Sequence, residues 1–194
     1  MSITRVSELN GVTGLTPSSL FLISYGEGPI RESKHITVDD LFVYRSSYRY
    51  YGAFSSSQNQ TTTGGTQSFT YDSIDLANGM TTGTTSSQIN VLHSGTYNIQ
   101  FSAQIQRLQG GSSTNMFIWF SKNGNPIPNS NTAVGFSNNN QYMIAAWNII
   151  ETFNANDYFE IIWATSDSEI QISAVPSPEY GPSIPSIITT ITQI

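Results

Sequence analysis

Alternation of apolar and polar residues is clearest in the middle of the chain. Between Gly95 and Leu108, apolar residues recur at every second position with polar residues between them. Side chains of a β-strand point alternately to opposite faces, so a period of two predicts an antiparallel strand with one face buried. The residues predicted to face inward are Tyr97, Ile99, Phe101, Ala103 and Ile105.

Similar signals recur from Tyr50 onward, separated by turns rich in Gly, Asn, Ser and Pro. Short strands at this spacing are typical of a sandwich of two packed antiparallel sheets, and helical periodicity of any length is absent there. The sequence therefore predicts an all-β domain of about nine or ten strands. Besides 95–108, the expected strands are 51–55, 67–71, 88–92, 115–122, 141–153, 158–164, 169–174 and 186–193.

Two tight turns are predicted from their asparagine residues. Asn123 and Gly124 follow an apolar run, and Asn-Gly is the strongest short signal for a β-hairpin. Asn156 lies in a second turn, before Asp157, and Asn tolerates the left-handed backbone conformation better than most residues. The segment 129–140 is interpreted as a long surface loop that supplies amide groups without aromatic residues nearby.

These strands and turns resemble those of the C1q and tumour-necrosis-factor-like (TNF-like) jelly rolls. The resemblance rests on Ser94-Gly95-Thr96-Tyr97 at the entry of the long strand, on residues 117–124 and on residues 153–160, where Asn156 replaces the usual Gly. It implies a jelly-roll sandwich over residues 46–194, and it implies that three such domains pack as a homotrimer about a threefold axis.

Two predicted strands are apolar on both faces, at 116–120 and 142–150. An antiparallel strand has no reason to be apolar on a face exposed to solvent, so loops or another subunit are expected to cover the second face. The resemblance favours another subunit, and the alternative for each residue is a place in the core. The candidates for the trimer interface are Phe117, Trp119, Tyr142 and Trp147.

The first 45 residues have a different pattern. Strands are expected at 21–24 and 32–36, and short helices after Pro17 and over 38–44, with Thr37 as a candidate N-cap. The order of ITRVSEL, LTPSSLFLIS and HITVDDL resembles an N-terminal attachment module of tailed-bacteriophage structural proteins. The resemblance implies a small α+β docking module over residues 1–45. Its candidate docking residues are Leu9, Leu15, Leu20, Phe21, Ile36 and Leu41.

Composition narrows the classes of function. Charged residues make up 10% of the chain and the net charge is −6, which argues against a nucleic-acid binder, since such proteins neutralise phosphates with Lys and Arg. Arg45 and Arg49 do alternate with tyrosines and could stack on bases or a sugar, but a linker packed on a neighbouring subunit is the favoured interpretation. There is no cysteine, so no disulfide or thiolate zinc site can form. The sequence contains no run of about 20 apolar residues, so it does not predict a membrane-spanning helix.

Candidate catalytic chemistry is sparse. His35 and His93 fall in different modules, and no Gly-x-Ser-x-Gly motif accompanies them. The carboxylate pairs Asp72 with Asp75 and Asp167 with Glu169 could serve a glycosidase, but solvated turn residues explain them more simply. Asp72 and Asp75 are also possible calcium ligands, although no Asp-rich loop of fixed spacing is present. We therefore expect no enzyme activity, no cofactor and no dedicated metal site.

The resemblance of the first module, together with the sparse catalytic chemistry, implies a non-enzymatic structural protein of a phage virion. The two modules are joined by only a few residues, and a tail fibre normally has a long shaft, so we expect a trimeric capsid decoration or head-fibre protein. Its partners would be its own copies and a phage capsid or tail protein. It would be made in the host cytoplasm and assembled on the outside of the particle. The alternatives are a tail-fibre or receptor-binding protein that recognises host-surface glycan and a virion glycan hydrolase.

Overall fold

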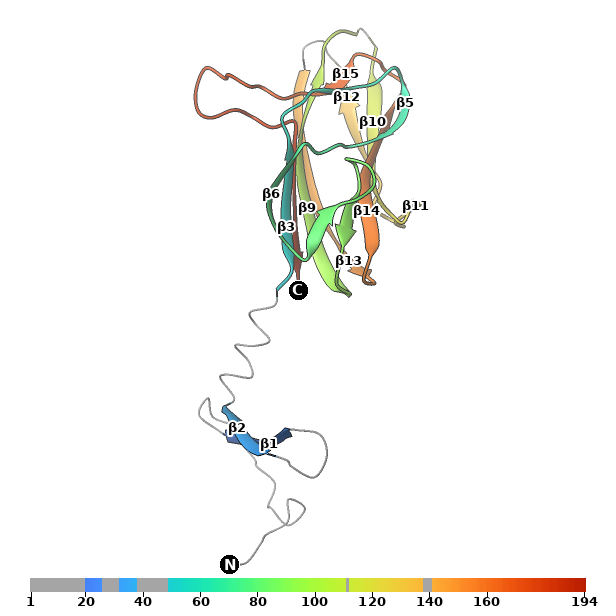
Figure 1. Cartoon of the computed structure of the whole chain (residues 1–194). Coiled ribbons are helices and arrows are strands. Elements are labelled where there is room, and N and C mark those ends of the chain that lie inside the picture. The colour runs from blue at the N-terminus through green and yellow to red at the C-terminus, as the bar shows by residue number, and fades with distance from the viewer. Residues whose placement is uncertain (1–19, 26–31, 38–48, 111, 138–140) are drawn as a thin grey trace, which may run out of the picture. The chain divides into compact units, whose positions relative to one another are not determined.

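The computed structural model describes residues 20–25, 32–37, 49–110, 112–137 and 141–194 of the chain (Figure 1). The chain divides into two compact units, Met1–Arg49 and Tyr50–Ile194. In the first unit, β1 (Leu20–Tyr25) pairs with β2 (Glu32–Thr37) as an antiparallel ladder. This ladder confirms the two strands expected in this unit. The two short helices expected there lie outside the described residues.

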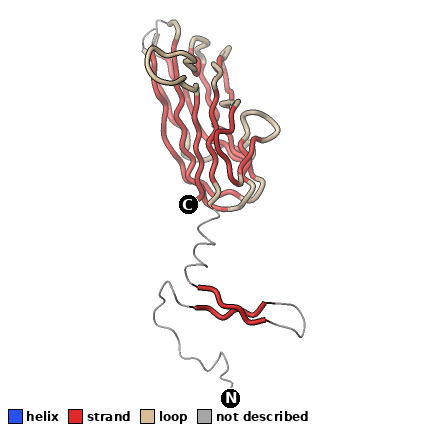
Figure 2. Tube along the Cα trace, turned by 60° about the vertical axis from the view of Figure 1, so that its left-hand side comes forward, coloured by secondary structure: helices blue, strands red, loops and turns tan. Residues whose placement is uncertain are grey.

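In the second unit, all regular structure within the described residues is β-strand (Figure 2). The strands form two sheets, which we name the β9 sheet and the β10 sheet after a long strand in each. The β9 sheet has the order β6-β3-β16-β9-β13, with β15 beside the end of β9 and β4 beside β15. Its strands are β3 (Tyr51–Ser56), β4 (Gln60–Thr61), β6 (Ser73–Asn78), β9 (Gly95–Arg107), β13 (Gln141–Phe153), β15 (Ile170–Ile172) and β16 (Ile187–Gln193). The β10 sheet has the order β7-β8-β14-β10-β12, with β5 beside β14 and β11 beside β10; its strands are β5 (Gly65–Ser68), β7 (Met80–Thr82), β8 (Ile89–Val91), β10 (Thr114–Lys122), β11 (Asn125–Pro126), β12 (Thr132–Phe136) and β14 (Asp157–Thr165).

The strand order is that of a jelly roll. The eight principal strands in chain order are β3, β8, β9, β10, β12, β13, β14 and β16. The β9 sheet places the first, eighth, third and sixth of them side by side, and the β10 sheet places the second, seventh, fourth and fifth. This double Greek key closes two antiparallel sheets over one core. The predicted all-β, C1q/TNF-like jelly roll is therefore confirmed.

The core lies between the two sheets and follows the alternation of the sequence. All five residues of β9 that were predicted to face inward are buried, from Tyr97 to Ile105. On the β10 sheet, alternate residues of β14 are buried opposite them, including Trp163. Aromatic rings link the two sheets: Phe101 of β9 meets Phe120 of β10, with 5.7 Å between ring centroids. The Tyr71 hydroxyl shares a buried 2.8 Å hydrogen bond with Thr189 of β16.

Both predicted asparagine turns are confirmed. Asn123 and Gly124 connect β10 to β11 with positive φ angles of 51° and 78°, as a two-residue hairpin with both central residues left-handed requires. Asn156 connects β13 to β14 with a φ of 70°, so it adopts the left-handed conformation that its replacement of glycine predicted.

The segment interpreted as one long surface loop is different in the structure. Residues Thr132–Phe136 form β12, which pairs with β10 from Thr114 to Ile118, and the Phe136 side chain is buried in the core. The loop prediction for 129–140 was therefore wrong over these five residues. Only Val134 and Phe136 of β12 pack on the core, so the strand carries too short an alternation to be recognised between its asparagine-rich flanks.

Candidate functional site

The structure does not bring the four interface candidates together on one surface. Phe117 and Trp119 lie on β10 and face outward from the β10 sheet, because their neighbours Met116, Ile118 and Phe120 are buried. Tyr142 lies on β13, faces outward from the β9 sheet and is 65% exposed. Trp147 is also on β13 but faces inward, where its ring packs edge-on against Phe101 with 4.6 Å between the ring centroids.

The outward face of the β9 sheet carries large apolar side chains on β6, β3, β16 and β13, while β9, which lies between β16 and β13, presents only uncharged polar residues there. We call this surface the β9 face. Burial alternates along β13 and β9, so that Tyr142 lies opposite Gln106 and Ile144 opposite Gln104 on the outward side. Sequence reasoning found Tyr142 but missed the other members. The large apolar residues of the β9 face are Tyr51, Leu76, Tyr142, Ile144, Ile150 and Ile188.

No outward position of β3, β9, β13 or β16 is charged. The polar residues among them are Asn, Gln, Ser and Thr, and several are already paired within the sheet. The Gln106 amide donates to the Tyr142 hydroxyl at 2.7 Å, and Asn148 donates to Asn98 at 3.0 Å. A shallow hollow of about 180 Å³ lies between β9 and β16 at Ser102 and Ile188. Charged residues are depleted in the cores of protein interfaces, and the β9 face has that composition.

The outward face of the β10 sheet, the β10 face, is different. Its two aromatic side chains on β10 each lie beside a hollow. Trp119 lines a hollow of about 260 Å³ with Asn129 and Asn131, while Phe117 lines another of about 530 Å³ beside Ala164 and Asn115. Trp119 was not predicted from the sequence to lie near Asn129, although the Asn123-Gly124 hairpin signal indicates that the chain turns back there. That hairpin folds the chain back along β10 and so places Asn129 and Asn131 beside Trp119.

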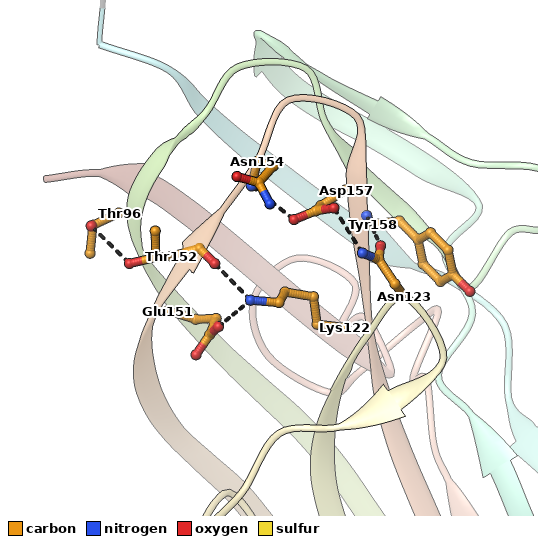
Figure 3. Close-up of polar contacts among 8 residues, drawn as sticks. All are labelled: Thr96, Lys122, Asn123, Glu151, Thr152, Asn154, Asp157 and Tyr158. Atoms are coloured by element: carbon orange, nitrogen blue, oxygen red, sulfur yellow. Dashed lines mark hydrogen bonds and ion pairs between the residues drawn. The ribbon is translucent and has the colours of Figure 1, made fainter.

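At one end of the sandwich, polar contacts join the two sheets (Figure 3). The Lys122 ammonium of β10 forms a 2.5 Å ion pair with Glu151 of β13 and donates to the Thr152 carbonyl at 2.8 Å. Nearby, Asp157 accepts hydrogen bonds from the Asn123 amide at 2.7 Å and from the Asn154 backbone N–H at 2.8 Å. These two hydrogen bonds hold the pKa of Asp157 below its ordinary value.

A second, more buried ion pair joins Arg107 of β9 to the turn after β14. Arg107 is 2% exposed, and its Nε and Nη2 atoms lie 2.9 and 2.8 Å from the Asp167 carboxylate. The other oxygen of Asp167 accepts the Glu169 backbone N–H at 3.0 Å. Of the pair considered above for glycosidase chemistry, the Asp167 carboxylate is therefore engaged in a structural ion pair, and Glu169 donates its backbone N–H to it.

The other catalytic candidates also have structural contacts. The His93 ring stacks on Tyr50, with 3.8 Å between centroids. Asp72 accepts the Ser57 hydroxyl at 2.7 Å and the Ser57 backbone N–H at 3.0 Å, and Asp75 accepts the Ser73 hydroxyl at 2.6 Å. Among the described residues, no group of three or more His, Cys, Asp or Glu side chains could hold a metal ion.

Three of the docking candidates fall on the described ladder of the first unit. Leu20 and Phe21 are in β1 and Ile36 is in β2, with Phe21 directly opposite Ile36. His35, the other histidine considered above, is opposite Leu22 in the same ladder. The remaining candidates, Leu9, Leu15 and Leu41, lie outside the described residues.

Comparisons with known proteins give a likeness of fold. Two crystal structures of murine APRIL, determined at pH 8.5 and pH 8.0, each align with 75% of this chain and 99% of their own, at 9% sequence identity and TM-scores of 0.47 and 0.48. No family model matches the chain, and no curated protein matches it. Within the described residues, no helix is long and apolar enough to span a bilayer.

Proposed function

We propose that this chain is a non-enzymatic structural protein of a tailed-bacteriophage virion, a capsid decoration or head-fibre protein. Its jelly roll forms a homotrimer through the β9 face, and its first unit, residues 1–49, docks on a capsid protein. The protein is made in the host cytoplasm and assembles on the outside of the particle. The phage assignment is supported by the sequence resemblance of the first unit, and the trimer by the composition of the β9 face.

The observation that carries the trimer is the exposed, uncharged β9 face. Ile144 is 65% exposed and Ile150 60% exposed in the single chain, although both are aliphatic side chains on a regular strand. Burying such a side chain fully contributes about 1.5–3 kcal/mol. A surface of this kind is stable in water when another protein surface covers it, and copies of the same chain are the partners that are always present.

The trimer also explains how a small docking unit could attach the protein firmly to the particle. A unit of 49 residues buries little apolar surface, so each single contact with the particle is expected to be weak. Three docking units in one trimer act as a multivalent ligand, since binding of the first raises the effective concentration of the others. Firm attachment is therefore compatible with weak individual contacts.

The mass of the full chain in solution tests the trimer. Light scattering coupled to size-exclusion chromatography, repeated over a range of concentrations, should give three times the chain mass of 21.3 kDa. A monomer at all concentrations would contradict the proposed assembly.

Binding to particles tests the virion role. Purified protein should co-sediment with particles of the source phage from which this gene has been deleted, and electron microscopy should place it on the capsid. A Phe21→Asp variant should keep the trimer mass but lose co-sedimentation. Protein found on tail tips instead of capsids would favour the tail-fibre alternative, and no binding to either would contradict the virion role.

A second candidate function is recognition of host-surface glycan. It is favoured by one observation, the hollow at Trp119 that two exposed asparagines border. This candidate does not require an enzyme, and it is compatible with a trimer that leaves the β10 face free.

A further inference from the structure

We infer that the β10 face carries a binding site for an uncharged saccharide, with the Trp119 ring as a stacking platform and the Asn129 and Asn131 amides as hydrogen-bonding partners. The inference deepens the glycan-recognition candidate by naming the residues and the ligand class. It is independent of the trimer and of attachment to a particle, because none of these residues belongs to the β9 face or to the first unit.

The backbone around Trp119 is held in place by buried contacts. After the hairpin at Asn123, the chain returns along β10, and the Ile127 backbone N–H donates to the Phe120 carbonyl at 2.8 Å. Ser130 is buried, and its hydroxyl accepts the Phe120 N–H at 3.0 Å and donates to the Ile127 carbonyl at 2.8 Å. The residues on either side of this buried anchor, Asn129 and Asn131, are exposed and border the hollow. The site is therefore preorganised, which lowers the entropy cost of binding.

The amides at the hollow are free, whereas nearby asparagines are engaged. Asn123 donates its amide to Asp157, and Asn125 donates its amide to the Asn123 carbonyl. Within the described part of the chain, the Asn129 and Asn131 side chains make no hydrogen bond, and Asn129 holds a left-handed φ of 62°. A free carboxamide offers both donors and an acceptor, which matches the hydroxyl groups of a sugar.

The chemistry of the hollow indicates an uncharged ligand with an apolar face. Trp119, Pro126 and Ile127 supply apolar surface, and no residue from 123 to 150 is charged. A sugar ring has one face of C–H groups that can stack on an aromatic ring and a rim of hydroxyls that can bond to amides. The volume of about 260 Å³ suits one such ring better than a folded partner or an extended peptide.

A second subsite lies along the same strand. Phe117 is two residues before Trp119 on β10, so the two aromatic positions are about 7 Å apart on one face. The hollow at Phe117 is also bordered by Thr66, Ser113 and Asn115. It therefore again places an aromatic ring beside hydroxyl and amide groups. We therefore expect a chain of two or more sugar rings to bind more tightly than one ring.

Fluorine NMR on protein labelled with 5-fluorotryptophan tests the site. The chain has three tryptophans, so three signals are expected. The probes are neutral oligosaccharides of glucose, galactose, mannose and N-acetylglucosamine, of one to four rings, at up to about 10 mM. One of these series should shift the Trp119 signal, assigned with Trp119→Phe, and leave the buried Trp163 signal unchanged.

Matched variants separate binding from folding and assembly. Trp119→Ala should weaken binding at least tenfold, and Asn131→Ala by about threefold to tenfold because one hydrogen bond is lost. Asn125→Ala and Tyr180→Ala, which change an engaged amide and an exposed aromatic residue outside the site, should leave affinity unchanged. Phe117→Ala should abolish the gain from a second ring but keep binding of one ring.

Three results would overturn the inference. They are no shift with any probe, a Trp119→Ala variant that binds as the wild type does, and a Trp119→Ala variant whose mass in solution changes, which would make Trp119 a subunit contact. Loss of saccharide binding with an unchanged trimer mass would support the site and leave the assembly proposal standing. A monomeric wild type that still binds saccharide would contradict the trimer alone.

Discussion

The two outward faces of the jelly roll differ although the same kind of strand builds both. On the β9 face, long aliphatic and tyrosine side chains lie around a shallow hollow, and some of the polar residues are hydrogen-bonded to one another. On the β10 face, the aromatic residues of β10 lie beside hollows bordered by amide and hydroxyl groups. The first composition suits a protein partner and the second a small polar ligand.

The difference indicates that the core specifies the fold while the outward residues specify function. Inward positions of both sheets are filled by the same types of residue, chiefly Ile and Phe. Outward positions do not contribute to this core, so they are free to vary in chemistry. In this chain they define one face for assembly and one for recognition.

Deletion of residues 189–194 should have the largest effect, because it removes most of the strand on which the β9 face depends. β16 lies between β9 and β3, Ile191 is buried, and Thr189 is the buried partner of Tyr71. Loss of the isoleucine and of the hydrogen bond each costs about 1–3 kcal/mol, and two strand edges are exposed as well. Against a total stability of 5–15 kcal/mol for typical domains, we expect the variant to fail to fold. Soluble protein with the wild-type circular dichroism spectrum would contradict this.

A matched pair of lysine substitutions should separate the two faces in assembly. Ala146 on β13 and Ala133 on β12 are both exposed, both on the edge strand of a sheet, and both outward. Ala146→Lys places a charge in the proposed interface, where desolvation is costly, so the mass should fall to that of one chain. Ala133→Lys should remain a trimer. Sedimentation velocity distinguishes the two outcomes, and equal behaviour of both variants would remove the contrast between the faces.

Alanine substitutions should sharpen the same contrast within the original interface candidates. Tyr142→Ala removes a large side chain from the β9 face and should weaken the trimer by about tenfold or more in dissociation constant, as expected for a tyrosine in an interface. Phe117→Ala on the β10 face should leave the trimer unchanged. Dilution followed by mass photometry measures both, and a trimer sensitive to Phe117 would move the interface to the β10 sheet.

The sequence was sufficient for the long strands because their alternation extends over many residues. β9, β13, β14 and β16 were predicted within about two residues of their observed ends, as was the left-handed turn at Asn156. β6 was missed, since it is an edge strand in which Asp75 and Asn78 dilute the apolar pattern. β12 was missed for the same lack of a long alternation.

The site could be predicted less well because it depends on which strands become neighbours. Alternation places Phe117 and Trp119 on one face and puts Tyr142 and Trp147, five residues apart, on opposite faces. It does not say which side of β13 is inward, because both sides are apolar. That choice is made by the pairing with β9, a contact between residues about 40 or more positions apart in the middle of the strands.

The smallest expected effect concerns two carboxylates, one beside each sheet. Asp72 lies beside β3 of the β9 sheet, and Asp157 lies at the start of β14 in the β10 sheet. Burial raises the pKa of Asp72, but hydrogen bonds from Ser57 and Gln58 outweigh it, so that its pKa, like that of Asp157, lies below the ordinary value of 3.8. A lowered pKa in the folded state means that each group stabilises the protein above pH 3.8, and that this stabilisation is lost as the pH falls through the folded pKa. Urea unfolding between pH 7 and pH 2.5 should therefore show a loss of stability in acid. That loss should be smaller in Asp72→Asn and in Asp157→Asn, and the curves of wild type and variants should converge at the acid end. A variant that stays parallel to the wild type over the whole range would show that its carboxylate contributes nothing to the pH dependence.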